Sequence, residues 1–326
     1  MRAAWYSRFG EAAEVLETGD IEAPEVGAGD VLVRVEVSGV NPVDVKRRQG
    51  GRGEMEAPKV IPHFDGAGTI EAVGEGVDSG RVGDRVWIYE AQWGSPLGSA
   101  AENVVVPSVR AVPLPDGTEA TAGACLGIPA LTAHRGVFSD GPVSGQSVLV
   151  TGGAGAVGRY AIQFAKLGGA KVFSTVSSEE KAELARSAGA DEVIDYKTED
   201  VAGCVLELTN GMGVDRIVEV EMGGNLATSL EILRVNGVIA TYASEANPEP
   251  VLRFYPSLYK SLVLRHILVF QIPEEAKELA VADISGWMEA GQITHHIGER
   301  FSLDEIVAAH QAVESGAVGK VLVEIG

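Results

Sequence analysis

Hydrophobic and polar positions follow one spacing in the first third of the chain and another beyond residue 120. Residues 31–37 alternate, with Arg34 and Glu36 on one face and valines on the other, which predicts a half-buried strand. Further short strands, separated by Gly and Asp turns, are predicted at residues 69–73, 85–89 and 104–106. Short strands at this spacing favour a small barrel or sandwich.

After residue 120 helical and strand-like segments alternate, which predicts a parallel, doubly wound sheet. Helices such as 179–188 and 226–233 lie between strands predicted at residues 148–151, 171–175, 192–195, 216–220 and 237–241. Residues 266–270 are predicted as a sixth strand at an edge. Because an apolar edge strand invites pairing, we expect a homodimer through the segment from His266 to Phe270.

The pattern changes again after Pro273. Two amphipathic helices are expected at residues 274–290 and 303–315, and a last strand at residues 320–325. This tail is too short for a core of its own, so we expect it to complete the first domain.

The run VTGGAGAVG, from Val150 to Gly158, lies where a buried strand turns into a helix. Its G-x-G-x-x-G pattern consists of Gly153, Gly155 and Gly158. In this setting the first glycine permits a tight turn, the second lets a pyrophosphate approach the backbone, and the third lets helix and strand pack closely. The helix N-terminus then offers free N–H groups to the phosphates. The alternative is a glycine-rich turn without a ligand.

Charge and cysteine content narrow the function classes. The 326 residues include 46 acidic and 26 basic side chains, a net charge of −20 that argues against binding nucleic acid or anionic membrane. Solubility or a salt-tolerant host would also explain the charge. The two cysteines, Cys125 and Cys204, are expected as buried thiols in a reducing cytoplasm. No signal sequence is recognised, and charged residues break the apolar stretch 258–270, so no membrane span is expected.

The chain resembles the zinc-free branch of the medium-chain dehydrogenase/reductase superfamily, near the quinone oxidoreductases and zeta-crystallin. The resemblance rests on motifs that occur in order over nearly the full length. They are GVNPVD at residues 39–44, DGAG at 65–68, VG at 73–74, VGDRV at 82–86, GIP at 127–129, LTA at 131–133 and GAVGK at 316–320.

The resemblance implies an α/β fold in which a Rossmann doubly wound sheet is inserted in a GroES-like, barrel-type catalytic domain. The catalytic domain is expected at residues 1–122 and 262–326 and the dinucleotide-binding domain at residues 123–261, with the active site in the cleft between them.

Zinc is not expected, although much of the superfamily uses it. Zinc requires three or four converging soft or imidazole ligands. In the zinc-using relatives a Cys stands at the position of Asn41, a His at Phe64 and a second Cys near Ile128. Two cysteines also cannot fill a four-cysteine structural site, and His63 stands alone.

The expected cofactor is NADPH. Sheets that bind NAD usually carry an acidic residue at the end of the second strand, where this chain has Ser177 and Ser178. Lys181 follows within one helical turn and adds positive charge, although it could be merely solvated. Glu179 and Glu180 argue against a phosphate at this position, unless their role is to stabilise the helix N-terminus.

The resemblance supplies further candidate contacts. Asn41 would form a hydrogen bond with the nicotinamide carboxamide or with a substrate carbonyl. The alternative is that Asn41 is only a turn residue before Pro42. Thr132 would approach the nicotinamide ribose or cap the helix that follows, and Lys320 would lie by the cofactor cleft or be a surface cation. The remaining cofactor contacts are Ala156, Val157, Tyr196 over the adenine region, Tyr242, Ala243 and Phe270.

Several positions depart from the family pattern. Tyr242 is bulkier than the usual Gly, and Glu219 and Glu221 place two unexplained carboxylates near the cofactor. His63 stands where the family residue is often small. Tyr89 and Trp93, with Gln92 between them, fall where relatives line the substrate mouth, as ring-stacking surfaces or as wall packing.

These features predict an NADPH-dependent reductase of quinones or similar electron-poor conjugated carbonyls. A hydroquinone anion takes its proton from solvent, which fits a cleft without an evident acid; His63 or Tyr89 are the candidate donors. The alternatives are an enone, alkenal or acryloyl-thioester reductase, which uses the same fold, and a non-catalytic NADPH-binding protein.

Overall fold

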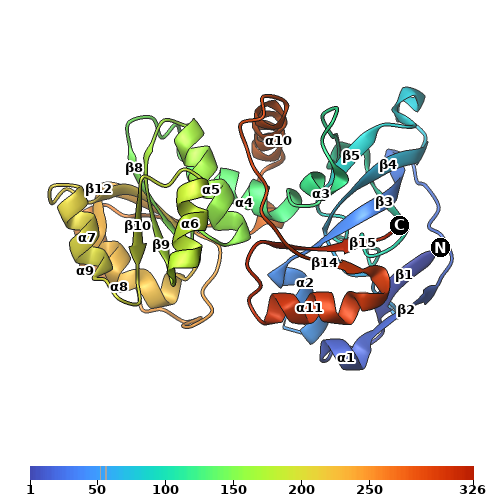
Figure 1. The fold of residues 1–326 in the computed structure, drawn as a ribbon, viewed down its shortest axis with the longest axis horizontal. Coiled ribbons are helices and arrows are strands. Elements are labelled where there is room, and N and C mark those ends of the chain that lie inside the picture. Colours follow the sequence, from blue (N-terminus) through green and yellow to red (C-terminus); the bar gives the residue numbers. More distant parts are fainter. Residues whose placement is uncertain (52, 56) are drawn as a thin grey trace. The chain divides into compact units, whose positions relative to one another are not determined.

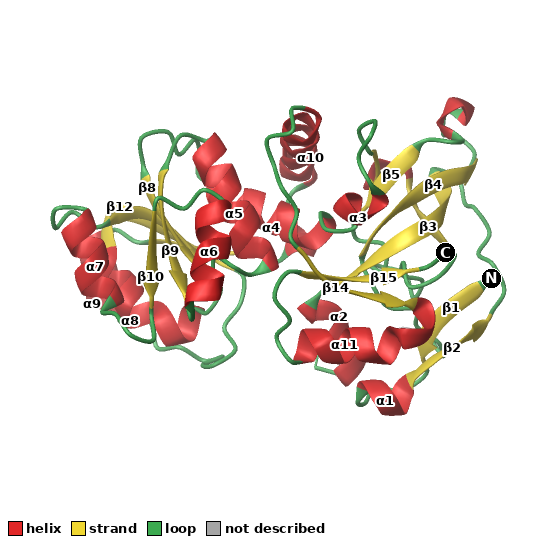
Figure 2. Cartoon of the chain, in the orientation of Figure 1, coloured by secondary structure: helices red, strands yellow, loops and turns green. Residues whose placement is uncertain are grey.

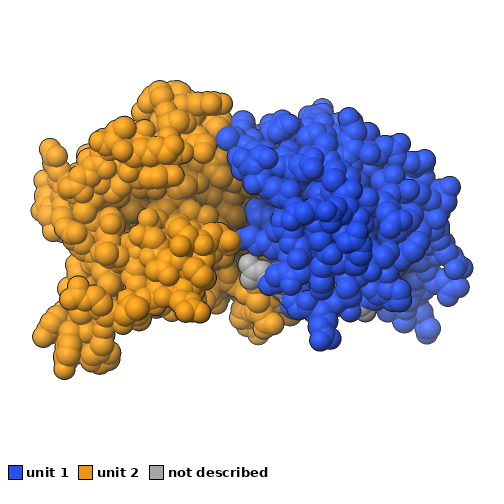
Figure 3. All heavy atoms as spheres, turned by 90° about the horizontal axis from the view of Figure 1, so that it is seen from below, with its two compact units in different colours: residues 1–128, 281–326 blue, residues 129–280 orange. Residues whose placement is uncertain are grey.

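The computed structural model describes residues 1–51, 53–55 and 57–326 (Figures 1 and 2). The chain divides into two compact units, coloured separately in Figure 3. Unit 1 comprises Met1–Ile128 and Val281–Gly326, and unit 2, Pro129–Ala280, is inserted between these segments. The domain boundaries predicted near residues 122 and 262 stay a prediction.

Unit 1 is built on two sheets. An antiparallel pair joins β1 and β2, and the other sheet runs in the order β14-β15-β3-β4-β5-β7, with β6 also pairing with β3. The strands are β1 (Arg2–Tyr6), β2 (Leu16–Asp20), β3 (Asp30–Val40), β4 (Asp65–Val73), β5 (Arg85–Ile88), β6 (Asn103–Pro107), β7 (Ala111–Pro113), β14 (Ile297–Ser302) and β15 (Lys320–Glu324). These confirm the strands predicted in the first third and at the C-terminus.

The long strand β3 organises this larger sheet. Its first half pairs with β6 and its second half with β15, while β4 lies along its other side. Val31, Val33 and Val35 are buried in the core and Arg34 is exposed, as the alternating pattern predicts. The helices of unit 1 are α1 (Ala12–Val15), α2 (Pro42–Gln49), α3 (Ala120–Gly123), α11 (Ile306–Glu314) and the 3-10 turns η1 (Ser79–Arg81), η2 (Ser108–Arg110) and η4 (Leu303–Glu305).

Unit 2 contains a parallel sheet in the order β10-β9-β8-β11-β12-β13, the doubly wound arrangement predicted from the sequence. Its strands are β8 (Ser147–Thr151), β9 (Lys171–Val176), β10 (Glu192–Asp195), β11 (Val214–Glu219), β12 (Leu233–Thr241) and β13 (Val263–His266). The helices α5 (Ala156–Leu167) and α6 (Glu179–Ser187) lie on one side of the sheet (Figure 2). The other side carries α7 (Val201–Leu208), α8 (Met222–Ile232) and α9 (Phe254–Lys260).

Two helices cross the unit boundaries in sequence, α4 (Gly127–Phe138) and α10 (Glu274–Glu289). No helix among the described residues has the length and apolar character needed to cross a bilayer.

The position predicted for the sixth strand is wrong. β13 covers Val263–His266 and pairs with β12 up to Thr241, whereas Val269–Gln271 forms the 3-10 turn η3. The apolar run after His266 reflects burial, since Val269 and Phe270 lie in the interior while the strand itself is partly exposed at the sheet edge. The expected edge location is confirmed.

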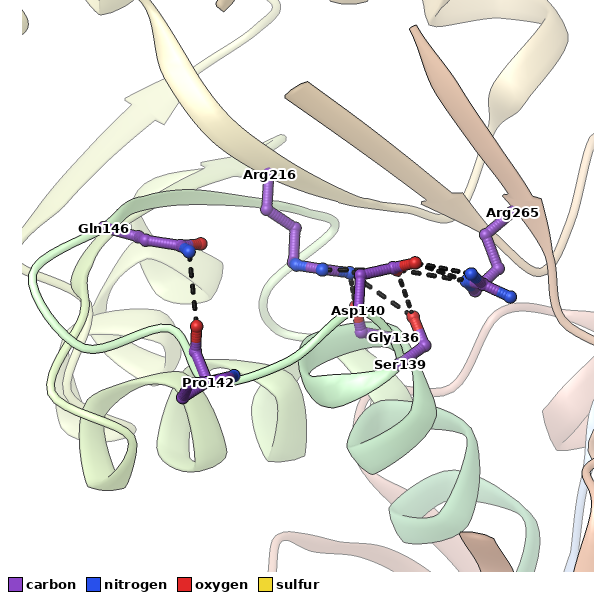
Figure 4. A network of polar contacts seen from close by, with 7 residues as sticks. All are labelled: Gly136, Ser139, Asp140, Pro142, Gln146, Arg216 and Arg265. Atoms are coloured by element: carbon purple, nitrogen blue, oxygen red, sulfur yellow. Dashed lines mark hydrogen bonds and ion pairs between the residues drawn. The ribbon is translucent and has the colours of Figure 1, made fainter. Parts of the chain in front are cut away.

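A network of charges fixes this edge strand to the sheet (Figure 4). Asp140, just after α4, accepts hydrogen bonds from Arg265 on β13 and from Arg216 on β11. Arg216 is almost fully buried and also donates to the carbonyl oxygen of Gly136 at 3.0 Å. Burial alone would raise the pKa of Asp140, but the bonds from Arg265 and Ser139 lower it. The carboxylate therefore stays charged and joins α4 to two strands.

Candidate active site

The glycine-rich turn of unit 2 is shaped by close packing. Gly152, just before the G-x-G-x-x-G pattern, has the left-handed φ of 66°, so the turn role predicted for Gly153 belongs to Gly152. A Cβ at Gly153 would lie 2.0 Å from Ser174 Oγ, and one at Gly158 would lie 2.4 Å from the Gly152 carbonyl oxygen. Neither position accommodates a side chain, which brings β8, β9 and α5 close together.

Gly155 is the N-cap residue of helix α5 and has no side chain to cap it. A Cβ there would meet only the Gly152 carbonyl oxygen, at 3.3 Å. The first N–H groups of a helix have no partner within it, so Ala156 and Val157 present donors and the positive end of the helix dipole. This cradle fits a pyrophosphate.

The end of β9 carries a cation and two hydroxyl groups. The Lys181 ammonium group donates to Ser177 Oγ at 3.1 Å, and Ser178 Oγ accepts the Lys181 backbone N–H at 3.4 Å, capping α6. Glu179, one of the two acidic residues that weighed against a phosphate here, pairs with Arg186 at 2.7 Å. The structure therefore brings Ser177, Ser178 and Lys181 together.

Tyr196 follows β10, the neighbour of β9 in the sheet. Its backbone N–H donates to the Val176 carbonyl oxygen at 3.1 Å, and the residue is 53% exposed. The phenol ring is therefore a free apolar surface next to the end of β9, where the sequence predicts the adenine region.

The two unexplained carboxylates have structural partners. Glu219 is fully buried at the end of β11 and accepts hydrogen bonds from Thr151, Asn225 and the Glu221 backbone N–H. Glu221 caps α8 through the Gly224 N–H and accepts the backbone N–H groups of residues 245 and 246. Together they tie the ends of β8 and β11 to α8 and to the loop after β12.

The other predicted cofactor contacts in unit 2 lie on three elements. Tyr242 follows β12; its N–H donates to the Glu219 carbonyl oxygen at 3.2 Å, and burial and the Glu219 charge raise the pKa of its phenol. The Ala243 carbonyl oxygen accepts from the Met222 N–H at 3.0 Å. Thr132 is buried inside α4, so the alternative that it caps a helix is wrong. Phe270 is buried in η3.

Unit 1 contains a buried polar group of Asn41, Asp65 and Lys320, which we call the Lys320 cluster. Lys320 Nζ donates to Asn41 Oδ1 at 2.6 Å and to Asp65 Oδ2 at 2.8 Å, and Asn41 Nδ2 donates to the same Asp65 oxygen at 2.8 Å. All three side chains are at most 3% exposed. The alternative that Lys320 is a surface cation is therefore wrong.

Local structure explains how these three residues meet. Asn41 is the N-cap residue between β3 and α2, while Asp65 begins β4 and Lys320 begins β15, the two strands on either side of β3. Asp65 also accepts the Ile128 N–H at 2.9 Å, at the start of α4. Asp65 lies within the DGAG motif but was not predicted as a site residue; an acidic residue at the start of a buried strand was the available signal.

A second acid, Asp44, lies beside the Lys320 cluster. Its Oδ2 accepts the Asn41 backbone N–H at 2.6 Å, whereas its Oδ1 is buried without a hydrogen-bond partner among the described residues. Burial and the nearby Asp65 charge raise the pKa of Asp44 to about 7. Asp44 was also not predicted as a site residue, because its burial arises only when the chain is folded.

His63 is fully buried and bonded at both ring nitrogens, to Ser38 Oγ at 2.8 Å and to His310 Nε2 at 3.0 Å. Its φ of 82° is left-handed, a conformation in which a non-glycine residue costs about 1–2 kcal/mol. Burial and the neighbouring His310 lower the pKa of His63 well below its usual range. The proton-donor role expected for His63 stays a prediction.

The segment from Tyr89 to Trp93 is held by Arg110. Arg110 Nη1 donates to the carbonyl oxygens of Glu90 and Trp93 at 3.1 and 3.2 Å. Tyr89 is buried, its ring is tilted at 41° to that of Trp87, and its hydroxyl donates to the Val109 carbonyl oxygen at 3.4 Å. Trp93 is partly exposed. Substrate contact by either ring stays a prediction.

Within the described residues, no three His, Cys, Asp or Glu side chains come together as a metal site. At the positions of the zinc ligands in relatives, Phe64 is fully buried and Asn41 is bonded to Asp65 and Lys320.

Comparisons with known proteins agree with this architecture. The family model of the alcohol dehydrogenase GroES-like domain matches residues 27–116, and that of the zinc-binding dehydrogenases matches residues 156–285. The quinone oxidoreductase of Pseudomonas aeruginosa is 35% identical over 304 residues, 91% of each chain. The 2-methylene-furan-3-one reductase of Solanum lycopersicum is 30% identical over 99% of this chain and 79% of its own length.

Solved structures show the same fold. A mycobacterial quinone oxidoreductase has a TM-score of 0.88 at 32% identity, with both chains covered completely, and a mycobacterial protein solved with NADPH gives the same values. These similarities extend over both units. The chain belongs to the medium-chain dehydrogenase/reductase superfamily, among the enzymes of quinone oxidoreductase type.

Proposed function

We propose that this chain is an NADPH-dependent reductase of quinones or similar electron-poor conjugated carbonyls, acting in the cytoplasm. The observation that carries the proposal is the group formed by Lys181, Ser177 and Ser178 next to the glycine turn. A 2′-phosphate needs a cation and hydroxyl donors, and an acidic residue at this point would repel it. The names of the quinone oxidoreductase relatives and the NADPH-bound mycobacterial structure support the same activity.

The residues of unit 2 fit the parts of a dinucleotide. Ala156 and Val157 would hold the pyrophosphate at the open end of α5, and Tyr196 would cover the adenine. Thr132, Tyr242, Ala243 and Phe270 remain our proposed contacts toward the nicotinamide half. When bound, the cofactor supplies a hydride, the chemistry that the side chains themselves cannot provide.

The Lys320 cluster is suited to stabilise a developing negative charge. A lysine ammonium has three N–H donors and an amide has two. Lys320 uses two of its donors on Asn41 and Asp65, and Asn41 uses one on Asp65. One N–H of each remains for an oxygen of the acceptor or of the nicotinamide carboxamide. In a water-excluded site such fixed donors favour the enolate or hydroquinone anion.

Cofactor choice is tested by changing Lys181 to Ala. The variant loses a charge-assisted bond of about 1.5–3 kcal/mol, which corresponds to a rise of about 10- to 150-fold in the Kd for NADPH. Binding of NADH should change little. The matched control is Lys171→Ala, an exposed lysine at the opposite end of β9. Equal loss of both coenzymes, or no loss of NADPH, would contradict the assignment.

The acceptor class is tested by following NADPH oxidation with a naphthoquinone and, separately, with a simple enone. Turnover of the quinone is expected. Enone reduction is the second candidate, favoured by the similarity to the tomato 2-methylene-furan-3-one reductase. Tight NADPH binding without turnover of either acceptor would support the non-catalytic alternative.

We also propose a homodimer through the outer edge of β13. This strand ends the sheet, and α9, which precedes it, exposes Phe254, Tyr255 and Tyr259 by 69%, 65% and 75%. An unpaired edge beside exposed rings suits a second copy. Light scattering of the native chain and of a Val263→Lys variant tests this; a native monomer would refute it.

A further inference from the structure

A chain of buried hydrogen bonds runs through unit 1 and ends at the backbone of Asp65. His310 Nε2 lies 3.0 Å from His63 Nε2, and His63 Nδ1 lies 2.8 Å from Ser38 Oγ. Ser38 Oγ lies 2.8 Å from Ser99 Oγ, which donates to the Asp65 carbonyl oxygen at 2.6 Å. All of these residues are fully buried. We call this group the histidine chain.

The direction of every hydrogen in the histidine chain follows by elimination. A carbonyl oxygen only accepts, so Ser99 gives its single hydroxyl hydrogen to Asp65, and Ser38 must give its own to Ser99. Ser38 then has no hydrogen for His63, so His63 Nδ1 is the donor. Because burial lowers the pKa of His63 well below its usual range, the ring is neutral and Nε2 accepts.

The same argument fixes the tautomer of His310. Its Nε2 must carry the hydrogen that His63 Nε2 accepts, and burial and the Arg48 charge lower its pKa to about 3. His310 Nδ1 is therefore an unprotonated acceptor. This atom is buried and has no hydrogen-bond partner among the described residues, so no neighbouring acceptor calls for a hydrogen on it.

The backbone of His63 shows that the side chain matters at this position. Its φ of 82° lies in the left-handed region that favours glycine. The strained turn is held by backbone bonds from Ser99 to the His63 carbonyl oxygen and from Ala100 to that of Pro62. A glycine would take this φ without strain, so the bonds of the imidazole ring are what a histidine adds.

The histidine chain joins the three segments that carry the Lys320 cluster. Ser38 lies on β3 just before Asn41, His63 lies two residues before Asp65, and α11, which carries His310, packs on β15. Its last acceptor is a carbonyl oxygen, which cannot pass on a proton. The chain therefore holds atoms in place and does not conduct protons.

We propose that His310 and His63, acting through Ser38 and Ser99, are positioning residues that fix Asp65 and thereby the donor geometry of Lys320 and Asn41. The link to catalysis rests on the proposed function, whereas the hydrogen-bond direction does not. The geometry assigns His63 the Nδ1–H tautomer and His310 the Nε2–H tautomer.

The direction is tested by nitrogen NMR of the full chain labelled with ¹⁵N-histidine at pH 7. The chain has six histidines, and His310→Leu and His63→Gly identify the two sets of signals. The expected result is His63 protonated only at Nδ1 and His310 only at Nε2. His63 protonated at Nε2, or a doubly protonated ring at either position, would overturn the proposal.

Positioning is tested with His310→Leu, which removes the donor, and His310→Gln, whose amide N–H can replace it. With a naphthoquinone, His310→Leu should lower kcat about 10-fold, the scale of one lost buried hydrogen bond, with the KM for NADPH nearly unchanged. His310→Gln should restore most of kcat. Ala309→Gly, a change at a buried neighbour on α11, controls for destabilisation of the helix. Full kcat in His310→Leu, or equal loss in both His310 variants, would refute positioning.

A readout independent of turnover separates this proposal from the proposed function. The Ile128 amide donates to Asp65 Oδ1, so its hydrogen exchange reports on that carboxylate. Exchange at Ile128 should accelerate in Ser99→Ala and in His310→Leu while amides within β15 stay protected. If the native chain turns over no acceptor, the function fails but the tautomer and exchange results still decide the histidine chain. Unchanged exchange at Ile128 would count against it.

Discussion

Changing Asp65 to Asn tests the energetics of the Lys320 cluster directly. The variant keeps the size of the side chain and an oxygen for the Ile128 N–H, but it leaves the Lys320 ammonium buried beside a neutral amide. At 2.8 Å and an effective dielectric constant of about 20, the lost attraction is about 6 kcal/mol.

Two effects reduce the net loss. Asn41 Oδ1 still accepts from Lys320, and Asp44, whose pKa is raised in part by the Asp65 charge, becomes easier to ionise near the ammonium. We therefore expect unit 1 to lose about 3–5 kcal/mol of unfolding free energy, the usual result of removing one partner of a buried ion pair.

Tryptophan fluorescence during urea unfolding is the appropriate assay. The four tryptophans, Trp5, Trp87, Trp93 and Trp287, all lie in unit 1, so their signal follows that unit alone. The matched control is Asp304→Asn, the same substitution in the exposed ion pair with Arg2, for which we expect less than about 1 kcal/mol.

A double variant separates charge from packing. Asp65→Asn with Lys320→Met removes both charges, and such apolar replacements of buried pairs are often neutral, so it should recover at least half of the loss. The reasoning is refuted if Asp65→Asn matches the exposed control, or if the double variant is no more stable than Asp65→Asn.

Three further predictions concern pH, the glycine turn and the charge network. The pKa of Asp44 is about 7 in the folded chain against 3.8 unfolded, so its contribution to stability is fully present below about pH 4 and is lost as the pH rises toward 7. In urea unfolding, unit 1 should lose about 2–3 kcal/mol of unfolding free energy between pH 5 and 8. Asp44→Asn should flatten this pH dependence. Gly153→Ala would place a Cβ 2.0 Å from Ser174 Oγ, so it should lower stability and abolish the thermal shift caused by NADPH. Gly155→Ala, the control, should keep the fold. Equal stability of the two variants would contradict the packing argument. Asp140→Asn should destabilise unit 2 by about 3 kcal/mol because Arg216 stays buried without its carboxylate, measured as faster amide exchange in β11; unchanged exchange there would show that the pair contributes little.

Local patterns were sufficient for the parallel sheet and its glycine turn. Each βα unit can be recognised from a short stretch of sequence, because local backbone geometry sets the spacing of apolar residues and the glycines between strand and helix. The turn itself was placed one residue late: only the structure shows that Gly152, and not Gly153, has the left-handed φ. The sixth strand was misplaced because Ile267, Val269 and Phe270 are apolar for burial and not for strand pairing.

The polar interior of unit 1 depended on the tertiary structure. Lys320 and Asn41 are 279 positions apart in the chain, and His63 and His310 are 247 apart, so no window of sequence joins them. Motifs marked Asn41 and Lys320 for the site, but the depth of their burial and the Asp65 carboxylate between them follow from β4 and β15 flanking β3. The sequence by itself determines which segments become strands and helices, since those choices rest on neighbouring residues. Only the packing of distant segments decides which charged side chains are removed from water, and which partners offset that desolvation with hydrogen bonds and ion pairs.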